Sequence, residues 1–579
     1  MPIILAKTAG FCYGVRRAMK LALTAAQTHK TNLFTLGPLI HNRQAVDLLK
    51  SRGISITDSV DNLPPESRVL IRAHGIKPKI RRLLMERCTE VCDATCPHVT
   101  AAQNIVRTYT SRGYSCIIIG DRGHAEVEGL LGCAGDRGYV VEDEEDIRKL
   151  PEMDKVCIIS QTTQEREKFE RIVERIKKRN PDARVFNTIC NATTQRQEEL
   201  LDIAQKSDLV IVVGGATSAN TRRLVEISED YGTDTIHVET ADEIPLEKID
   251  ARTVVGITAG ASTPHWVIRN VVETVENHQL EKRSVLLRTF HGIMFFAIYS
   301  SLILASGAFF LTYTSTSLMR LSFAPEEAFL AFFFVLSMHL INKRLSLPKD
   351  ERLMYGSLKS FAKYKGAFTI LAVFAIISSL ILAGFLSGLT FILILLAVIL
   401  GFAYSFTIIP KSLSRKIHYR KLMDIPGSKD IFMAAAWSVV TVFLPFINRG
   451  AENWPGFLVT LAFVVLLVLI RSVLLDVRDL EGDIVLGKET VPILLGFRKS
   501  IFLIRGFILL IFLIPLTGWI SGLFPADALF LCFLPFYILI HYLFSKRQVL
   551  YQSLLYDVYL DAQFILAGMM MFLGSTILG

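Results

Sequence analysis

Apolar runs near 20 residues in length recur through the second half of this chain, and they limit its fold more than any other feature. They begin near residue 288, whereas residues 1–283 have the charged, mixed composition of a globular domain. A helix of about 20 apolar residues crosses the hydrocarbon core of a bilayer. The 579-residue chain is 51% hydrophobic, with a mean hydropathy of +0.41, which is too apolar for an ordinary soluble protein. We therefore expect two domains, a soluble one over 1–283 and a membrane one over 284–579.

The membrane half is expected to be an all-α polytopic domain of about nine helices. The apolar segments lie near 289–313, 325–341, 367–385, 388–409, 430–447, 455–475, 501–520, 525–545 and 557–578. The loops on one side hold 20 Lys and Arg residues, whereas the opposite loops hold only Arg320 and Arg449. Basic loops face the cytosol, so the pattern predicts an integral protein of the cytoplasmic membrane with its N-terminal domain in the cytosol.

Two further observations agree with that location. The opening residues MPIILAKTAG lack the basic start and long apolar stretch of a secretory signal. The net charge of +9 needs no nucleic-acid partner, because many of the basic residues lie in the loops at the predicted cytosolic membrane face. The lipid bilayer is the expected partner.

The soluble half repeats one local pattern, in which a short β-branched run ends in a small or polar turn and a helical stretch follows. Such alternation predicts α/β lobes with parallel sheets, whose ligands bind at the carboxyl ends of the strands. Any one polar residue in such a turn is more often an ordinary hydrogen-bonded residue than a functional one, but their recurrence favours a shared pocket. The residues in these turns are His41, His74, His124, Glu126, Thr162, Thr163, Ser218, Asn220 and Ser262.

Three cysteines occupy similar turns. Cys12, Cys96 and Cys190 each precede a helical stretch in a segment rich in Gly, Pro, Thr or Asn. Disulfides are rare in a reducing cytosol, so metal or redox chemistry is the favoured role. A helix N-terminus stabilises a thiolate, which is the form that binds metals. Separations of 84 and 94 residues suggest three similar lobes, each of which contributes one cysteine to a shared centre.

The membrane half contains an acidic stretch, LLDVRDLEGDIVLGKETVP. Its residues Asp476, Asp479 and Asp483 are spaced to lie on one face of a helix. Carboxylates on one face could bind Mg²⁺, which in turn binds a diphosphate. A solvated loop between two spans is the alternative.

Ordered motifs over nearly all of residues 1–280 carry a family resemblance. They are GFCYGV, GPLIHN, RAHG, ATCPHV, GHAEVEG, SQTT, TICNATTQRQ and TAGAS. They resemble those of 4-hydroxy-3-methylbut-2-enyl diphosphate reductases, which complete the methylerythritol phosphate route to isoprenoids. The resemblance implies a three-lobed fold around a [4Fe–4S] cluster bound by Cys12, Cys96 and Cys190. Its fourth iron would be open to the substrate hydroxyl.

The same resemblance implies roles for the other residues. Glu126 would deliver the proton that lets water leave, with Thr162 and His124 beside it, and the products would be isopentenyl and dimethylallyl diphosphate. Ferredoxin or flavodoxin would supply electrons. The substrate contacts implied are His41, His74, His124, Thr162, Ser218, Ala219, Asn220 and Ser262. Position 219 is Ser in some relatives, so Ala219 lacks one hydroxyl contact.

The membrane half resembles the UbiA-like prenyltransferases, which have about nine helices and two Asp-rich motifs. The second motif matches Asp476, Asp479 and Asp483. The first begins at Asn342 but continues with Lys343, has Ser346 where a carboxylate is expected, and regains the pattern only at Asp350. The Mg²⁺ and diphosphate ligands implied are Asn342, Asp350, Asp476, Asp479 and Asp483, with Glu351 as one replacement for the missing carboxylate.

Three functional hypotheses follow. The first is a bifunctional enzyme, in which one half makes five-carbon diphosphates and the other transfers prenyl groups. The second is the same reductase with a non-catalytic membrane anchor, since Ser346 removes a carboxylate from the first motif. The third makes the soluble half a zinc-binding or redox-sensing module.

Overall fold

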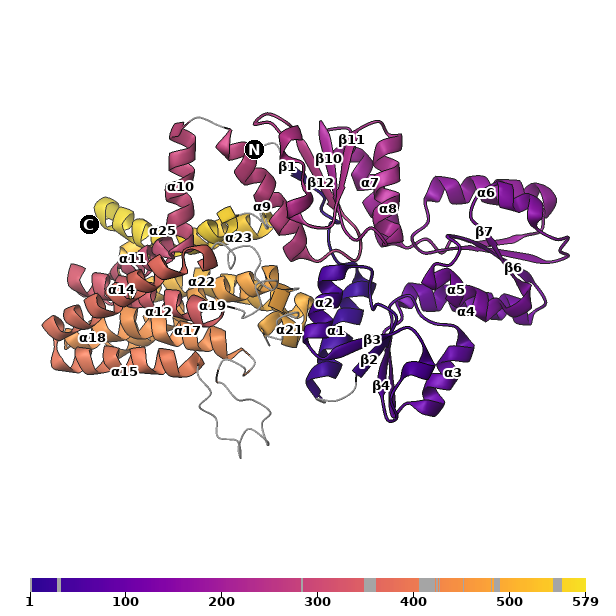
Figure 1. The fold of residues 1–579 in the computed structure, drawn as a ribbon. Helices are drawn as coiled ribbons and strands as arrows, with labels where there is room; N and C mark the ends of the chain where they lie inside the picture. Colours follow the sequence, from indigo (N-terminus) through magenta and orange to yellow (C-terminus); the bar gives the residue numbers. More distant parts are fainter. Residues whose placement is uncertain are drawn as a thin grey trace. The chain divides into compact units, whose positions relative to one another are not determined.

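The computed structural model describes residues 3–28, 33–282, 285–347, 361–405, 422, 425, 427–450, 452–480, 482–483, 490–544 and 554–578. The chain divides into two compact units, residues 1–282 and residues 283–579. We call them the first and second units and describe each by itself (Figure 1).

The first unit contains three four-stranded parallel sheets, as the alternating pattern predicts. Parallel sheets have helices on both faces, and this is why the strands are mostly apolar. The first sheet has the order β1 (Ile3–Leu5), β12 (Val255–Ala259), β10 (Leu209–Val213), β11 (Asp234–Val238). The second has the order β3 (Ile54–Thr57), β2 (Leu33–Leu36), β4 (Arg68–Ile71), β5 (Glu90–Asp93). The third has the order β7 (Gly138–Val141), β6 (Ser115–Ile119), β8 (Val156–Ser160), β9 (Arg184–Phe186).

Nine α-helices accompany these sheets among the described residues of the first unit. They are α1 (Tyr13–Thr28), α2 (Arg43–Ser51), α3 (Pro78–Arg87), α4 (Pro97–Ser111), α5 (Ala125–Ala134), α6 (Arg166–Arg179), α7 (Asn191–Ala204), α8 (Ala219–Asp230) and α9 (His265–Glu281). Several begin with strong start signals. The Asn42 side chain accepts a hydrogen bond from the Ala45 N–H at the start of α2, and proline opens both α3 and α4.

The third sheet shows how strand alternation produces the layers. On β6, Cys116 and Ile118 face a core shared with α4 and α5, whereas Ile117 and Ile119 face a core shared with α6. Side chains on a strand alternate between the two faces of the sheet. A run of apolar residues therefore fills both cores, and the helices cover both faces (Figure 1).

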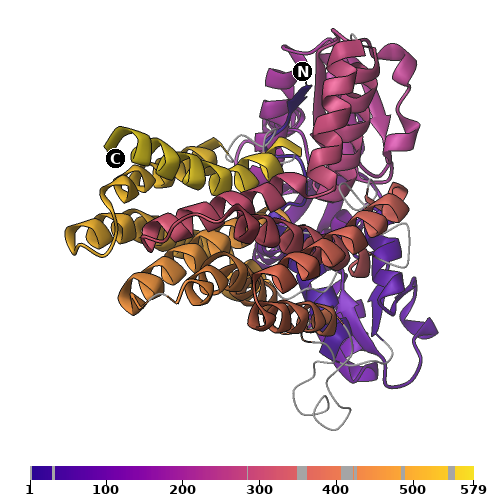
Figure 2. The ribbon, with the colours of Figure 1, turned by 90° about the vertical axis from the view of Figure 1, so that its left-hand side faces the viewer.

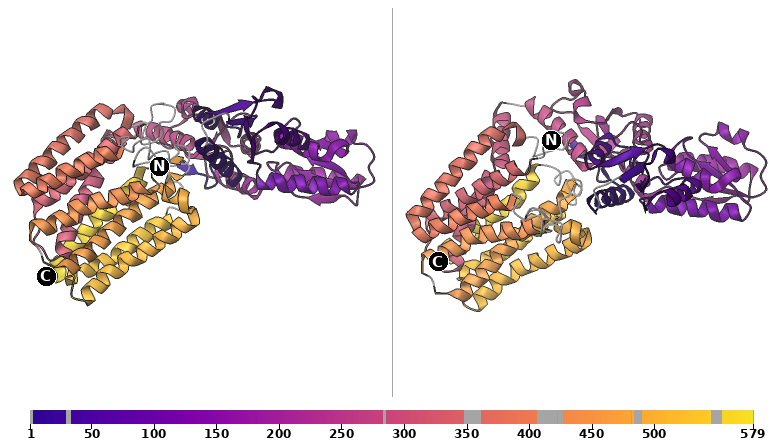
Figure 3. Two further views of the ribbon diagram at one scale, coloured as in Figure 1. Left: turned by 90° about the horizontal axis from the view of Figure 1, so that it is seen from below. Right: turned by 60° about the horizontal axis from the view of Figure 1, so that its bottom comes forward.

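The second unit is a bundle of helices that run side by side (Figures 2 and 3). Helix α11 packs against α12 and α25, and α19 packs against α17 and α22. Its elements are α10 (Val285–Tyr299), α11 (Leu302–Leu318), α12 (Pro325–Leu345), α14 (Lys365–Leu386), α15 (Gly388–Ser405), α17 (Ser428–Ser438), η8 (Val439–Phe443), α18 (Leu444–Asn448), α19 (Trp454–Arg478), α21 (Val491–Leu495), α22 (Phe497–Ile520), η9 (Ala526–Phe533), α23 (Leu534–Phe544) and α25 (Leu554–Leu578).

The all-helical prediction is confirmed, and the count of nine spans is approximate. Among the described residues, six helices are long and apolar enough to cross a membrane, and a bent pair makes a seventh. The segments expected near 388–409 and 525–545 contain shorter apolar helices, 388–404 and 526–540. Large apolar side chains are exposed on the bundle, for example Phe385 at 85% on α14 and Phe502 at 79% on α22. Such surfaces are stable against lipid rather than water.

The first predicted span is broken rather than continuous. Helices α10 and α11 meet at 65° around Ser301, whose φ of 62° lies in the left-handed region. The ammonium of Lys343 donates to the Ser301 Oγ at 2.9 Å and to the Tyr299 carbonyl at 3.4 Å. A cation at the C-terminal end of α10 satisfies a carbonyl that the broken helix leaves without its usual partner. Lys343, which stands where the first Asp-rich motif often has Asp, thus contacts the two residues at this break.

Candidate functional site

The three candidate cysteines occupy equivalent places in the three sheets of the first unit. Cys12 follows β1 and precedes α1, Cys96 follows β5 and begins α4, and Cys190 follows β9 and begins α7. All three line one cavity, which we call the first cavity. Each cysteine N–H donates to a carbonyl in the loop after the neighbouring strand, at 3.0, 2.9 and 3.0 Å to Ala261, Ala73 and Thr162 respectively.

Two arginines, a half-buried one on α1 and a buried one on α7, connect the cysteine-bearing segments of different lobes. On α1, Arg17 Nη1 donates to the Thr95 carbonyl at 3.0 Å, next to Cys96. On α7, the guanidinium of Arg196 donates to the Gly10 carbonyl, two residues before Cys12. These bonds hold the three cysteine segments in one arrangement.

The surroundings of the thiols favour a bound metal centre. Backbone N–H groups of His98 and Val99 donate to the Cys96 sulfur, and those of Ala192 and Thr193 donate to the Cys190 sulfur. Burial raises the pKa of both thiols, and these N–H groups oppose that rise. Such donors at a helix N-terminus stabilise a thiolate bound to metal. A Cβ at Gly14 would lie 2.6 Å from the Cys96 Sγ, so glycine lets the sulfur lie against α1.

Three histidines form a second wall of the first cavity. His41, His74 and His124 have ring centroids 4.7 to 5.9 Å apart, and their ring nitrogens lie within 4.8 Å of one another. Burial lowers the pKa of His124 to about 4, and the nearby charge of His41 adds to this effect. Burial is also the main cause that lowers the pKa of His41 and His74. All three imidazoles are therefore neutral near pH 7, and each carries one N–H donor.

Several buried polar atoms in the first cavity have no hydrogen-bond partner among the described residues. They are His41 Nε2, His74 Nδ1 and Asn220 Nδ2. Ser262 Oγ, also in this wall, donates to the His41 carbonyl at 3.1 Å. Leaving a buried polar group unpaired costs free energy, so these atoms favour a polar ligand. Neutral N–H donors are suited to an anion such as a phosphate.

Among the described residues, Glu126 is the one carboxyl side chain that lines this cavity, and it is 1% exposed. Its Oε1 accepts from the Thr162 N–H at 2.7 Å and its Oε2 from the Thr162 hydroxyl at 2.8 Å. Burial raises the pKa of Glu126 to about 7, against the opposing effect of the Thr162 hydrogen bonds. The carboxyl can therefore hold or release a proton at neutral pH.

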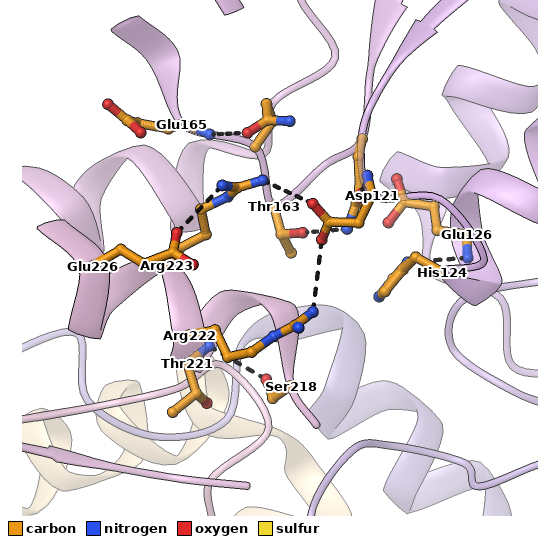
Figure 4. A network of polar contacts seen from close by, with 12 residues as sticks. Asp121, His124, Glu126, Thr163, Glu165, Ser218, Thr221, Arg222, Arg223 and Glu226 are labelled. Carbon is orange, nitrogen blue, oxygen red and sulfur yellow. Dashed lines mark hydrogen bonds and ion pairs between the residues drawn. The ribbon is translucent and has the colours of Figure 1, made fainter. Parts of the chain in front are cut away.

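Figure 4 shows the contact between His124 and Glu126 and, close by, the ion pairs of Asp121 with a neighbouring lobe. The Glu126 N–H donates to His124 Nδ1 at 3.2 Å, which leaves Nε2 to carry the imidazole proton. Close by, Asp121 forms an ion pair with Arg223 of α8 at 2.9 Å. This pair joins the loop after β6 to the first sheet's helices.

Every candidate residue of the first unit thus lines one cavity, from Cys12 to Ser262 and including Ala219. Sequence reasoning missed His98 and Thr193, which line it as well. Both lie inside quoted motifs, ATCPHV and TICNATTQRQ, two and three residues after the candidate cysteines. Their place in the first turn of a helix, next to a cysteine, was the signal available.

The second unit has its own cavity of about 350 Å³, which we call the second cavity. Most of its wall is apolar, with Phe334, Met338, Phe432 and Trp437 among the lining residues. Its polar lining residues are His339, Asn342, Ser346, Tyr404, Lys429, Asp430, Asp476 and Thr490. An apolar cavity with a few polar groups is suited to a ligand with a hydrocarbon chain and a charged head.

The candidate residues of the second unit are only partly brought together. Asn342 and Asp476 line the second cavity. Asp479 instead pairs with Arg478, its two oxygens lying 2.9 and 3.0 Å from the guanidinium. Helix α19 ends at Arg478, so Asp479 and Asp483 lie beyond its end. The Asp483 N–H donates to the Asp479 carbonyl at 2.8 Å, and the Asp483 carboxylate interacts electrostatically with Lys429, the partner of Asp476. Asp350 and Glu351 lie outside the described residues.

Comparisons with known proteins agree with this division. Residues 3–276 match the family model described as LytB protein, and residues 362–556 match the UbiA prenyltransferase family. The 4-hydroxy-3-methylbut-2-enyl diphosphate reductase of Caldanaerobacter subterraneus subsp. tengcongensis is 41% identical over 280 residues, which are 48% of this chain and 97% of that protein.

Two solved structures are also similar to parts of the chain. A reductase of E-1-hydroxy-2-methyl-but-2-enyl-4-diphosphate from Plasmodium falciparum is 28% identical, with a TM-score of 0.45, and covers 47% of this chain and 86% of its own. The apo structure of a UbiA homolog from Aeropyrum pernix K1 is 14% identical, with a TM-score of 0.32, and covers 45% of this chain and 97% of its own.

The fold and the two cavities define a two-part protein, an α/β unit with a cysteine- and histidine-lined cavity followed by an apolar helical bundle. The chain belongs to the 4-hydroxy-3-methylbut-2-enyl diphosphate reductase (LytB) family and carries a UbiA prenyltransferase family domain behind it.

The raised pKa of Glu126 predicts a specific pH dependence of stability. The folded protein keeps the Glu126 proton up to about pH 7, whereas the unfolded chain releases it near 4.5. The resulting stabilisation is present below the unfolded pKa and is lost as pH rises through the folded pKa. Relative to Glu126→Gln, wild type should lose on the order of 3 kcal/mol of unfolding free energy between about pH 5 and about pH 8. Denaturant unfolding of both proteins measures this, and parallel pH curves would contradict it.

Proposed function

We propose that the first unit reduces 4-hydroxy-3-methylbut-2-enyl diphosphate to isopentenyl and dimethylallyl diphosphate, and that the second unit transfers prenyl groups. The observation that carries the first part is the convergence of three cysteines, one from each sheet, on a cavity with unpartnered N–H donors and a protonatable carboxyl. A relative matched over 97% of its length carries the name of this reductase. The functional domains we propose are residues 1–283 and 284–579.

The first cavity fits a [4Fe–4S] cluster held by Cys12, Cys96 and Cys190. Its three thiols come from three lobes, and backbone N–H groups donate to two of the sulfurs. Gly14, in the first turn of α1, leaves room for the Cys96 sulfur. When bound, such a cluster supplies electrons and a Lewis-acidic iron with an open position. A soluble carrier such as ferredoxin or flavodoxin is the electron donor we propose.

The residues around it bind the substrate and place a proton. The neutral imidazoles of His41, His74 and His124 donate N–H groups to the diphosphate, and the Asn220 amide donates from the opposite sheet. Ser218 and Ser262, whose hydroxyls lie 3.5 Å apart, add further donors. Ala219 contributes only its place at the start of α8.

Overall, two electrons and two protons replace the allylic C–O bond by a C–H bond and release water. Glu126 delivers one proton to the substrate hydroxyl oxygen, which makes water the leaving group. Thr162 holds both carboxyl oxygens through its N–H and hydroxyl, so the acid keeps its orientation. Burial raises the pKa of Glu126 to about 7, so a substantial fraction of the carboxyl is protonated at neutral pH and can act as a general acid.

For the second unit, we propose that the apolar wall of the second cavity holds a prenyl chain and its polar residues hold the diphosphate. The carrying observation is that Asn342 and Asp476, one from each Asp-rich motif, line the same cavity. The bundle is integral to a membrane, and the excess of basic residues in alternate loops favours the cytoplasmic membrane with the first unit in the cytosol.

Replacement of Cys12 tests the cluster. Cys12→Ser should abolish both the brown chromophore and turnover in protein purified without oxygen, because a cluster ligand is lost. Iron and acid-labile sulfide analysis of wild type should find about four of each per chain, which separates this proposal from a zinc or redox-sensing module. Cys88→Ser, a half-buried thiol away from the cavity, is the matched control. Wild-type iron content in Cys12→Ser would contradict the assignment.

Replacement of Glu126 separates proton delivery from cluster binding. Glu126→Gln should keep the chromophore and lower turnover on the order of 10²–10⁴-fold, because the amide cannot donate the proton. Wild-type turnover should fall as pH rises above about 7, where the carboxyl ionises. Steady-state rates with hydroxymethylbutenyl diphosphate and a low-potential donor measure both. A fast variant would show that another group supplies the proton.

Prenyl transfer is tested in membranes that contain the full chain. With a labelled prenyl diphosphate and an aromatic quinone precursor, wild type should form a labelled lipid and release diphosphate. Asp476→Asn should reduce this at least about tenfold, whereas Glu326→Gln, an exposed carboxylate at the opposite end of α12, should not. Unchanged reductase activity without any transfer would favour the non-catalytic anchor.

A further inference from the structure

The polar residues of the second cavity include a set of buried oxygens that lack partners. Asn342 Oδ1, Asp430 Oδ2, Asp476 Oδ2 and Thr490 Oγ1 have no hydrogen-bond partner among the described residues, and all four side chains line the cavity. Asp430 is 2% exposed and Asp476 is 1% exposed. Buried carboxylate oxygens are costly unless they bind a donor or a cation. Three of the four atoms are pure acceptors, so a cation satisfies them better than an anion.

Asp430 belongs to neither Asp-rich motif. It lies in the first turn of α17, and its Oδ1 accepts a hydrogen bond from the Ser472 hydroxyl on α19. Ser472 is one helical turn before Asp476, so this bond holds Asp430 next to the second motif. The bond uses one oxygen of Asp430 and leaves Oδ2 unpartnered.

Asp476 is arranged in the same way. Its Oδ1 lies 2.8 Å from the Lys429 ammonium, and its Oδ2 is unpartnered. Lys429 lines the same cavity, so its ammonium lies beside the unpartnered oxygen of Asp476. Each carboxylate therefore has one anchored oxygen and one oxygen left for a ligand.

Charge balance points to a divalent ion. The charged side chains that line the cavity, among the described residues, are two carboxylates and one ammonium; their net charge of −1 repels a diphosphate. Lys343 does not correct this, because its ammonium contacts Ser301 and Tyr299 instead. A divalent cation would change the net charge to +1, and carboxylate and amide oxygens are the ligands that Mg²⁺ prefers.

We propose that Asp430 replaces the carboxylate missing at Ser346. Asp430, Asp476 and Asn342 then bind one divalent cation that holds the prenyl diphosphate, with Lys429 beside it. Ser346 lines the same cavity as Asp430, so the position of the missing carboxylate and its proposed replacement share one space. The inference rests on the proposed prenyl transfer and specifies which residues of this chain bind the metal.

Mn²⁺ binding to the full chain in detergent tests the assignment without relying on activity. Free Mn²⁺ is measured by its electron paramagnetic resonance signal, with geranyl thiodiphosphate as the unreactive probe. Asp430→Asn should weaken the probe-dependent Mn²⁺ affinity at least about tenfold. Asn retains the oxygen that accepts from Ser472, so the fold is kept, and thermal unfolding checks this. Any Mn²⁺ bound by the first unit should be the same in wild type and Asp430→Asn, so it does not affect the comparison. The control variant Glu326→Gln should bind Mn²⁺ as wild type does.

A second-site replacement makes the test sharper. Ser346→Asp introduced into Asp430→Asn should restore Mn²⁺ affinity to within a few-fold of wild type, because the two positions serve one ion. Wild-type affinity in Asp430→Asn, or no restoration by Ser346→Asp, would overturn the proposal. If the chain transfers prenyl groups but Asp430→Asn binds Mn²⁺ as wild type does, the assignment of Asp430 as a ligand is rejected and the proposed prenyl transfer is not. A wild type that neither transfers nor binds Mn²⁺ would instead reject the proposed prenyl transfer.

Discussion

The first unit depends on one geometric constraint, which is that parallel strands end at a single edge of their sheet. Each of its three sheets presents a cysteine just beyond such an edge, at the start of a helix. Cysteines 84 and 94 residues apart can therefore line one cavity without any local CxxC pair. Arg17 and Arg196 bond across the lobes to the other cysteine segments, so the site depends on how the lobes pack. The same edges place the histidines, Glu126 and Asn220 around that cavity.

This constraint also explains how far the sequence alone could predict the site. Strand-end residues are visible as polar turns after apolar runs, so His41, Glu126 and Ser262 could be expected to lie together. The ionisation of these groups could not be predicted, because it depends on burial. Glu126 has a pKa near 7 because it is buried, although the hydrogen bonds from Thr162 oppose that rise. His98 and Thr193 were missed because their one signal, a place in the first helical turn after a candidate cysteine, does not show which side chains of that turn face the cavity.

In the second unit the sequence could predict the helices but not their interruptions. Hydropathy locates apolar segments and cannot show a backbone break inside one, such as the left-handed Ser301 between α10 and α11. Residue spacing likewise assumes that one helix continues through the acidic stretch, although α19 ends at Arg478 and Asp479 pairs with Arg478. Asp430 could not be found by motif reasoning, because its contact to α19 is tertiary and separated by 42 residues.

The two cavities recognise charge in opposite ways, and this follows from their surroundings. The first cavity is lined by neutral N–H donors and one protonatable acid, and Arg72 and Arg222 lie close enough to act on its histidines, so the proposed diphosphate would meet donors and positive charge there. The second has buried carboxylates with free oxygens, so it needs a cation before it can accept an anion. In a low-dielectric bundle, an unpaired carboxylate is far more costly than in water. Retaining Asp430 and Asp476 there, each with one oxygen anchored by a neighbour, is therefore more consistent with a binding site than with a passive anchor.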